Sequence, residues 1–419
     1  MNSANLANYE SKMNKEIYKN LFNNEIKKIK KENRYRIFKE IKKNDSYPIA
    51  TNINEGQEKQ IIIWCSNDYL GMSKNQLILK KAINSIKKYG IGSGGTRNIS
   101  GTHQPIVKLE KEIANLHNKE SALVFTSGYV ANESTISSLT KILKDSIVFS
   151  DEKNHASIIS GIKKNKCEKI IFNHNDMTDL QNKLSSVDIN RPKIIIFESI
   201  YSMDGSIGDI SGILKLSKAY NAFTYVDEVH AVGMYGKLGA GISEKLNLQK
   251  ELNIIQGTLA KAYGTIGGYI TADYNICDAI RSTASGFIFT TSLPPLIAES
   301  AKASIRYLKT HKHLRQKQKE NVNFLKSQLI KRNLEIIPNN THIIPLMIRD
   351  ANLCNKISER LLKKYGHYIQ PINYPTVKMG EERLRITPGP LHSKEMMLDL
   401  VESLESVYKD FNFKNSKAA

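Results

Sequence analysis

Short apolar runs and longer mixed stretches alternate through the middle of the chain. Between residues 121 and 272, seven apolar runs have the length of buried strands, and stretches between them such as 178–186 and 213–220 have helical spacing. Strands that alternate with helices favour a mainly parallel sheet covered on both faces. The seven runs are residues 122–125, 147–149, 170–172, 193–197, 223–226, 254–256 and 269–271.

The segments on either side of this region have different patterns. The first 58 residues are polar and helix-forming, and the apolar run at 61–65 has the length of a strand. A long helical stretch from residue 295 to about residue 332 leads to shorter elements and a final helix at 393–410. We therefore expect an α/β protein with three parts. These are an N-terminal arm (1–58), a large domain with a mainly parallel seven-stranded sheet (59–309) and a smaller α/β C-terminal domain (310–419).

Composition and charge narrow the classes of partner. The 419 residues include 61 Lys and Arg against 41 Asp and Glu, which gives a net charge of +20. Such a chain can attract nucleic acid, anionic lipid or a coenzyme with several phosphates. Outside residues 27–36 the basic residues are scattered, and no nucleic-acid-binding module is visible, so we expect no nucleic-acid partner.

The sequence also allows a prediction of where in the cell the protein is located. It contains no run of about 18 apolar residues, so we expect no transmembrane helix. We recognise no signal peptide or presequence at the N-terminus, and we expect a cytoplasmic protein. The four cysteines, which lack metal-ligand or redox spacing, are Cys65, Cys167, Cys277 and Cys354.

Three polar residues follow apolar runs, where the ligands of parallel sheets gather. Asp227 stands directly after the run at 223–226, with His230 three residues later. Taken alone, Asp227 could cap a loop and His230 could fill a turn. Lys261 lies in a weakly charged, glycine-flanked loop after another run. Partial burial would lower its pKa, so that a neutral amine could attack an aldehyde.

Two further features complete a possible cofactor site. Ser127, Gly128 and Tyr129 form a turn before a helix, where backbone N–H groups can bind phosphate. His155 follows another run and could supply a flat face. Pyridoxal phosphate (PLP) needs a lysine for its aldehyde, an anion site and a carboxylate at its ring nitrogen. The glycine-rich segment 92–101 is either a mobile loop or backbone that passes close to a small substrate.

Five longer motifs resemble those of the α-oxoamine synthases, a family of fold-type I PLP enzymes. They lie at residues 154–157, 201–205, 227–233, 257–262 and 289–295, and the resemblance extends from about residue 34 to residue 404. It implies a fold-type I PLP-dependent transferase with PLP as the cofactor. One position departs from the family pattern, because Ile106 stands where a histidine is common.

Other segments resemble one branch of the family. Residues 33–38, 64–72, 95–102, 370–377 and 382–385 are most similar to members that condense glycine with succinyl-CoA and release 5-aminolevulinate, coenzyme A and CO2. Arg36 and the pair Thr96 and Asn98 argue against a glycine C-acetyltransferase or an 8-amino-7-oxononanoate synthase. Two alternatives from other classes are a basic nucleic-acid-binding protein and an inactive relative that serves as a scaffold.

The resemblance implies a role for each matched residue. Lys261 is the Schiff-base lysine and acid-base group, Asp227 pairs with the pyridine nitrogen, and His155 stacks on the ring. Arg385 binds the glycine carboxylate, and His230 hydrogen-bonds the ring oxygen with Ser202 nearby. Ser127, Gly128, Tyr129 and Thr258 hold the phosphate, with Thr290 and Thr291 of the neighbouring subunit, which implies a homodimer with shared active sites. The succinyl-CoA site is lined by Arg36, Thr96, Asn98, Ser150, Lys169 and Thr376.

Overall fold

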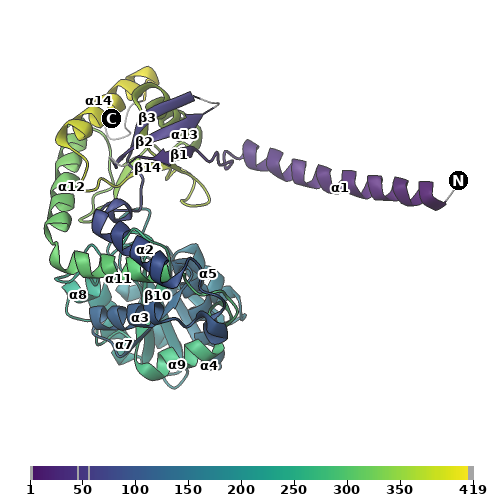
Figure 1. Cartoon of the computed structure of the whole chain (residues 1–419), viewed down its shortest axis with the longest axis vertical. Coiled ribbons are helices and arrows are strands. Elements are labelled where there is room, and N and C mark those ends of the chain that lie inside the picture. Colours follow the sequence, from purple (N-terminus) through teal and green to yellow (C-terminus); the bar gives the residue numbers. More distant parts are fainter. Residues whose placement is uncertain (1–2, 45–46, 55–56, 414–419) are drawn as a thin grey trace.

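The seven expected strands form one sheet at the centre of the larger body. Figure 1 shows the computed structural model, which describes residues 3–44, 47–54 and 57–413. The strand order is β4-β10-β9-β8-β7-β5-β6, and only β10 runs antiparallel to its neighbours. The mainly parallel sheet is therefore confirmed. The strands are β4 (Ser121–Phe125), β5 (Ile147–Asp151), β6 (Glu168–Phe172), β7 (Lys193–Glu198), β8 (Ala222–Asp227), β9 (Ile254–Thr258) and β10 (Gly268–Ala272).

Helices bury both faces of this sheet, so successive residues of a strand belong to different cores. In β4, Ala122 and Val124 pack with one group of helices, and Leu123 and Phe125 pack with the other. Ile106 is fully buried in the first core, so the departure from the family pattern is a packing change. The first face is covered by α3 (Gln104–His117), α6 (Met177–Ser185), α7 (Ile210–Ala219) and α11 (Pro295–Thr310), and the second by α4 (Gly128–Ile142), α5 (Ala156–Lys163), α9 (Tyr274–Thr283) and α10 (Ser285–Ile288).

The smaller body has its own sheet and core. Its strands are ordered β11-β14-β13, and its core contains the fully buried Trp64 together with residues of three helices. In Figure 1 this body lies above the larger one, and α12 runs from one to the other. The elements are β11 (Ile344–Met347), β13 (Pro371–Ile372), β14 (Arg383–Ile386), α12 (His313–Lys331), α13 (Ala351–Arg360), α14 (Lys394–Asp410) and a π-helical turn, η3 (Leu361–Tyr365).

The N-terminal segment is only partly helical, so the expectation of a helix-forming arm up to residue 58 is wrong in its second half. Helix α1 (Ser3–Lys31) projects away from both bodies (Figure 1). It is followed by β1 (Glu40–Lys43), β2 (Ile49–Asn54) and β3 (Gln57–Ile63). These strands pair with one another and with β12 (His367–Tyr368), about 300 residues further along the chain. Such long-range pairing leaves little trace in local sequence.

The helical stretch expected from residue 295 to residue 332 is in fact two helices. It breaks between Thr310 and His313, although no Pro or Gly stands there. The Thr310 hydroxyl donates to the backbone oxygen of Tyr307 at 3.0 Å, and such bonds compete with helix continuation. The remaining helices are α2 (Gln76–Tyr89), α8 (Ile242–Lys245) and two single turns, η1 (Met72–Lys74) and η2 (Arg97–Gly101). Within the described residues, no helix is both long and apolar enough to cross a bilayer.

Candidate active site

Asp227 is the last residue of β8 and is 4% exposed. Its Oδ2 accepts a hydrogen bond from the Asn132 side-chain amide at 2.7 Å, and its Oδ1 accepts one from the backbone N–H of Val229 at 2.8 Å. Burial raises the pKa of Asp227, whereas these two donors and the nearby Lys261 oppose the rise. A buried carboxylate held by two donors is suited to pairing with a protonated ring nitrogen.

Lys261 lies in the turn that follows β9, and its side chain is half-buried. Burial, with help from the Arg385 cation, lowers the pKa of Lys261 to about 8, and Asp227 acts in the opposite direction. The neutral amine that attack on an aldehyde requires is therefore more abundant near neutral pH than in an exposed lysine, and it becomes the dominant form above about pH 8. The expected pair of an amine and a carboxylate is brought together at one edge of the sheet.

The two histidines of the site have different surroundings. His155 caps α5, and its Nδ1 contacts the Ser157 hydroxyl at 2.8 Å, which leaves the ring exposed. His230 is 6% exposed and contacts the Tyr69 hydroxyl at 2.7 Å through Nδ1. Burial and the neighbouring cation of Lys261 hold the pKa of His230 well below its ordinary value, so its ring is neutral. An open ring can stack on a cofactor, and a neutral imidazole can exchange a hydrogen bond with a ring oxygen.

The N-terminus of α4 has the features of an anion site. Ser127 caps this helix by accepting the N–H of Val130 at 3.1 Å, and the first N–H groups of a helix have no acceptor within it. Gly268 of β10 allows the close approach of α4, because a Cβ there would lie 2.5 Å from the Gly128 backbone. Thr258, the strand partner of Gly268, is also close, because a Cβ on Gly128 would lie 3.6 Å from its side chain. Ser127, Gly128, Tyr129 and Thr258 therefore share one small region.

Arg385, on β14, is 6% exposed and belongs to the smaller body. Its guanidinium donates to the Ser202 backbone oxygen at 2.7 Å, to Asn67 Oδ1 at 3.2 Å and to the Tyr69 hydroxyl at 3.0 Å. Its influence on the pKa of Lys261 places the two cations near each other. In the described part of the chain no carboxylate forms an ion pair with Arg385. A buried guanidinium without an ion-pair partner can bind the carboxylate of a small ligand.

The residues expected at the succinyl-CoA site form separate groups. Arg36 contacts the Thr376 hydroxyl at 3.3 Å, and both line a cavity of about 600 Å³. Thr96 donates to Asn98 at 2.7 Å and pairs through its backbone with Thr291.

Thr290, which with Thr291 was expected at the cofactor phosphate of the neighbouring subunit, is half-buried. The remaining residues expected at the succinyl-CoA site are less closely associated, and Lys169 is exposed on β6. Ser150 is 1% exposed and accepts from the Asn154 amide at 2.9 Å, so its hydroxyl is turned into the protein. Across the described residues, no hydrogen bond joins these groups to Lys261.

Three residues of the site were missed in the sequence. Glu198 directly follows an apolar run, as Asp227 does, and the same rule would have found it. Tyr69 belongs to a motif that was used only to judge resemblance. Asn132 lies inside α4, where nothing local distinguishes it from a surface residue, because only the tertiary fold aims it at Asp227.

The residues present fit PLP. A half-buried amine, a buried carboxylate, an open imidazole ring and a helix N-terminus surround one region, in the combination that this cofactor requires. Arg385 adds a buried cation for the carboxylate of an amino acid.

Comparisons with known proteins show the family of the chain. The family model for aminotransferase class I and II matches residues 59–404. A 5-aminolevulinate synthase of Rickettsia prowazekii (strain Madrid E) is 53% identical over 402 residues, which cover 96% of both chains. The enzyme of the same name from Rhizobium meliloti (strain 1021) is 49% identical and covers 93% of this chain and 97% of its own.

Solved structures of other enzymes share the fold of this chain at lower sequence identity. A serine palmitoyltransferase from S. paucimobilis with a bound PLP–myriocin conjugate is 26% identical, with a TM-score of 0.83 over 88% of this chain and 91% of its own. An 8-amino-7-oxononanoate synthase from Francisella tularensis is 25% identical, with a TM-score of 0.72 over 84% of this chain and 98% of its own. The chain is a PLP-dependent acyltransferase of fold-type I, and it belongs to the 5-aminolevulinate synthase family.

Proposed function

We propose that the chain condenses glycine with succinyl-CoA and releases 5-aminolevulinate, coenzyme A and CO2, the first step of tetrapyrrole synthesis. One observation carries this proposal. The buried Arg385 guanidinium has no carboxylate partner in the described chain and lies close enough to Lys261 to help lower the pKa of its amine. An amino acid that binds its carboxylate to Arg385 therefore brings its α-carbon toward the lysine. Glycine suits this arrangement because the site must then admit an acyl group at the same carbon.

The chain's own residues have distinct parts in the reaction. Lys261 would hold the aldehyde of PLP, with Asp227 at the ring nitrogen, His155 on the ring face, and His230 and Ser202 near the ring oxygen. Once glycine takes its place, the freed amine of Lys261 accepts a proton from the glycine α-carbon. Its pKa of about 8 suits this exchange, because the amine is then close to equally able to accept and to donate.

PLP, when bound, withdraws electrons from the α-carbon, so that negative charge there is stabilised. The α-carbon forms a bond to the thioester carbon of succinyl-CoA, and the carbon–sulfur bond breaks with coenzyme A leaving as a thiolate, which takes up a proton from solvent. The bond to the former glycine carboxylate then breaks and CO2 departs. Lys261 returns a proton to the same carbon, which balances the proton that it removed.

The position of the Arg36 side chain supports succinyl-CoA as the acyl donor. Arg36 and Thr376 line one cavity, and the guanidinium can bind the far carboxylate of the succinyl group bidentately. An acetyl group has no such carboxylate. We propose that Thr96, Asn98, Ser150 and Lys169 complete the succinyl-CoA site, and that the chain's net charge of +20 favours a coenzyme with several phosphates.

We propose that the active enzyme is a homodimer in which Thr290 and Thr291 reach the cofactor phosphate of the neighbouring subunit. Helix α1 supports this assembly. It projects from its own chain and exposes Leu21 (60%) and Phe22 (72%), with Ile17 and Ile26 on adjacent turns. An isolated helix in water is marginal without a surface to pack against. A second copy supplies such a surface.

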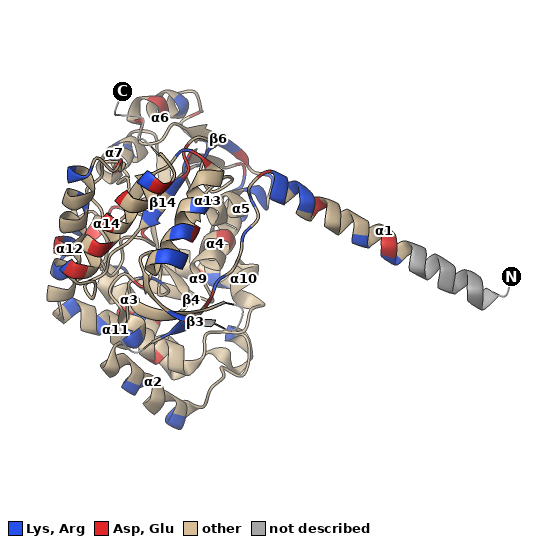
Figure 2. Ribbon diagram, turned by 90° about the horizontal axis from the view of Figure 1, so that it is seen from above, with Lys and Arg blue, Asp and Glu red and all other residues tan. Residues whose placement is uncertain are grey.

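The basic residues of α1 gather at its end near the body, as the blue segments of Figure 2 show.

We propose that residues 1–58 serve as an arm, residues 59–309 as the catalytic domain and residues 310–419 as the small domain. Because β1, β2 and β3 share a sheet with β12, the second half of the arm packs with the small domain. We also propose that the protein works in the cytoplasm, in line with the bacterial relatives.

A donor comparison tests the reaction. The purified chain, saturated with PLP and glycine, is given succinyl-CoA, acetyl-CoA or pimeloyl-CoA, and the amino ketone product is identified by mass. We expect 5-aminolevulinate from succinyl-CoA at a rate at least tenfold above that with acetyl-CoA, since one bidentate ion pair is worth more than about 1.4 kcal/mol. Pimeloyl-CoA also ends in a carboxylate, but its longer chain places this group further from the thioester, so we expect it to react more slowly than succinyl-CoA. Equal or faster turnover of acetyl-CoA would overturn the substrate assignment.

Lys261 is tested independently of turnover. Lys261→Ala should remove the absorbance of the lysine-bound cofactor while the protein keeps its fold. The control is Lys193→Ala, which removes a buried lysine that donates to three backbone oxygens far from PLP. Cofactor absorbance that persists in Lys261→Ala contradicts the role of this residue.

A further inference from the structure

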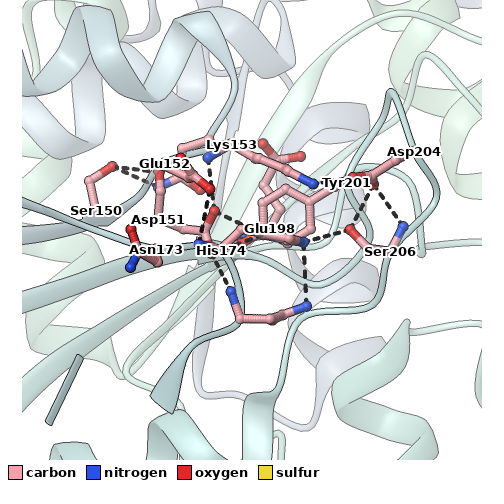
Figure 3. A network of polar contacts seen from close by, with 12 residues as sticks. Ser150, Asp151, Glu152, Lys153, Asn173, His174, Glu198, Tyr201, Asp204 and Ser206 are labelled. Carbon is pink, nitrogen blue, oxygen red and sulfur yellow. Dashed lines mark hydrogen bonds and ion pairs between the residues drawn. The ribbon is translucent and has the colours of Figure 1, made fainter. Parts of the chain in front are cut away.

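Glu198 is a buried carboxyl group that the reaction as described above does not use. It ends β7, is 3% exposed, and lies directly opposite Asp227 in the parallel pairing of β7 with β8. Two carboxyl groups therefore leave neighbouring strands at the same edge of the sheet. Figure 3 shows Glu198 in the middle of a polar network, beside Tyr201 and Asp151.

The contacts of Glu198 point to His155. Its Oε1 accepts the backbone N–H of His155 at 2.6 Å, and this N–H belongs to the cap of α5. The bond joins the end of β7 to the residue that stacks on the cofactor ring. Without the acceptor, a part-buried N–H would be left unpaired at that position.

The donors around the two carboxyl groups are unequal. Asp227 accepts two hydrogen bonds, from Asn132 and Val229. Within the described chain, the carboxyl of Glu198 accepts only the N–H of His155. Two carboxylates this close cannot both ionise cheaply, and the one with more donors keeps the charge.

The other charged groups that face Glu198 do not reverse this order. Asp151 on β5 is 2% exposed and is engaged by His174 and by the backbone of Lys153 (Figure 3). Burial, Asp227 and Asp151 raise the pKa of Glu198 well above that of an ordinary glutamate, and Lys261 opposes them with a smaller effect.

We propose that Glu198 is a positioning residue that acts as a neutral carboxylic acid: it fixes His155 over the cofactor ring and leaves Asp227 as the one ionised carboxyl beside the ring nitrogen. The inference rests on the proposed function, because it assigns His155 and Asp227 to PLP. The two neighbouring carboxyl groups then have different roles: Asp227 supplies the negative charge, and Glu198 holds His155 in position.

Substitution by glutamine tests the neutral state. Glu198→Gln keeps an oxygen for the His155 N–H and carries no charge at any pH. We expect its PLP dissociation constant and its kcat/KM to stay within about threefold of wild type, since no ionised group is lost. If Glu198 stays neutral as proposed, the pH profile of the cofactor absorbance should superimpose on that of wild type between about pH 6 and about pH 9.

Two further variants are compared with Glu198→Gln. Glu198→Ala removes the acceptor and should raise the PLP dissociation constant by about 10-fold to 100-fold. The matched control is Glu228→Gln, at another fully buried glutamate, which accepts the Ser199 hydroxyl and the N–H groups of Ile242 and Ser243. An amide there must turn its NH2 group toward a donor, so this variant should unfold at lower temperature than Glu198→Gln.

The outcomes separate this inference from the reaction itself. If Glu198→Gln binds PLP as poorly as Glu198→Ala, or shifts the pH profile, Glu198 is ionised and the inference is wrong. Wild-type affinity in Glu198→Ala contradicts the positioning role. If wild-type protein, measured alongside, binds PLP but forms no 5-aminolevulinate, the proposed function fails while the cofactor measurements on Glu198 still stand.

Discussion

Individual polar residues in the site are fixed by neighbours rather than by water. Asn132 donates to Asp227 and to Ser157, and its own oxygen accepts the Tyr225 hydroxyl at 2.7 Å. One amide therefore links the carboxylate at the ring nitrogen to the side chain that holds His155. In a low-dielectric interior such connected bonds hold geometry closely, and their loss is expensive.

Asn132→Leu should weaken cofactor binding. The variant keeps the volume of the side chain but deprives Asp227 of one of its two donors, so we expect the PLP dissociation constant to rise about tenfold. Titration of the cofactor-free protein by absorbance measures it. Asn165→Ala serves as control, because Asn165 donates to Ser137 and Thr140 away from the site. A larger effect in the control than in Asn132→Leu would contradict the assignment.

Tyr69→Phe should act on glycine more than on turnover. The hydroxyl of Tyr69 joins Arg385 to His230, so its loss frees the guanidinium from one of its three anchors. We expect the KM for glycine to rise about tenfold and kcat to fall less. Tyr269→Phe removes another buried hydroxyl, which contacts His117 at 2.9 Å, and should leave the KM unchanged. Equal effects of both variants would show that only general packing is involved.

The lowered pKa of Lys261 predicts that the rate of PLP binding depends on pH. Its pKa is lowered to about 8, so the neutral amine is scarce below that pH and dominant above it. The rate at which PLP joins the cofactor-free protein should therefore rise about tenfold per pH unit below about pH 8, and level off above it. Arg385→Gln removes a cation that lowers this pKa and should move the midpoint upward. A rate that is flat with pH would contradict the assignment.

At the level of single elements, the strands of the main sheet were predictable and their long-range partners were not. Each of the seven runs is apolar because both faces of the sheet are covered, and this signal is local. Lys261 and Asp227 were found because they follow such runs. The pairing of β3 with β12, and the break between α11 and α12, depend on contacts between distant segments. The positions of Asn132 and Tyr69 depend on such contacts as well.

The loop at Thr96 is tied to α3 by a bidentate ion pair. Arg97 contacts both oxygens of Glu110, at 2.6 and 2.9 Å, and the two side chains are 10% and 13% exposed. Glu110 also accepts the N–H of Val124 at 3.0 Å, so one carboxylate joins the loop, the helix and β4. The Thr96 side chain is therefore carried by an anchored loop, not by the freely mobile glycine segment that its composition suggests.

Glu110→Gln should loosen this anchor. Breaking a largely buried pair and leaving Arg97 uncompensated costs about 3 kcal/mol, so we expect a lower midpoint of thermal unfolding and a higher KM for succinyl-CoA. The control is Glu405→Gln, which removes the partner of Arg332 from a pair whose side chains are 35% and 30% exposed. That change should cost about 1 kcal/mol or less and leave the KM unchanged. The anchoring role is wrong if Glu110→Gln changes neither quantity.

At the level of the whole molecule, the site lies between two bodies. The loop at Ser202 is held by the smaller body, because Arg385 donates to Ser202 and Arg383 donates to the backbone oxygen of Met203 at 3.1 Å. The Asn339 amide adds a bond to the Asp204 oxygen at 2.9 Å. Only α1 lies apart from this arrangement (Figure 1).

The apolar surface of α1 predicts a change in assembly. Leu21→Glu combined with Phe22→Glu places two charges on the stripe that we assign to the second copy, so we expect the molar mass in solution to fall from that of a dimer toward that of a monomer. Light scattering after size-exclusion chromatography measures it. Ile330→Glu on α12, which alters a side chain that is 60% exposed, should leave the mass unchanged. A dimer that tolerates the double variant would rule out α1 as the contact.

The division of the site between the two bodies has a consequence for how its selectivity can change. Lys261 and Asp227, which we assign to the cofactor, are carried by the main sheet, whereas Arg385, which we assign to the amino acid, is carried by β14. Substitutions around β14 can therefore alter which amino acid is accepted without disturbing the chemistry of the ring. A redesign that changes which amino acid the site accepts therefore needs to alter only the residues around β14.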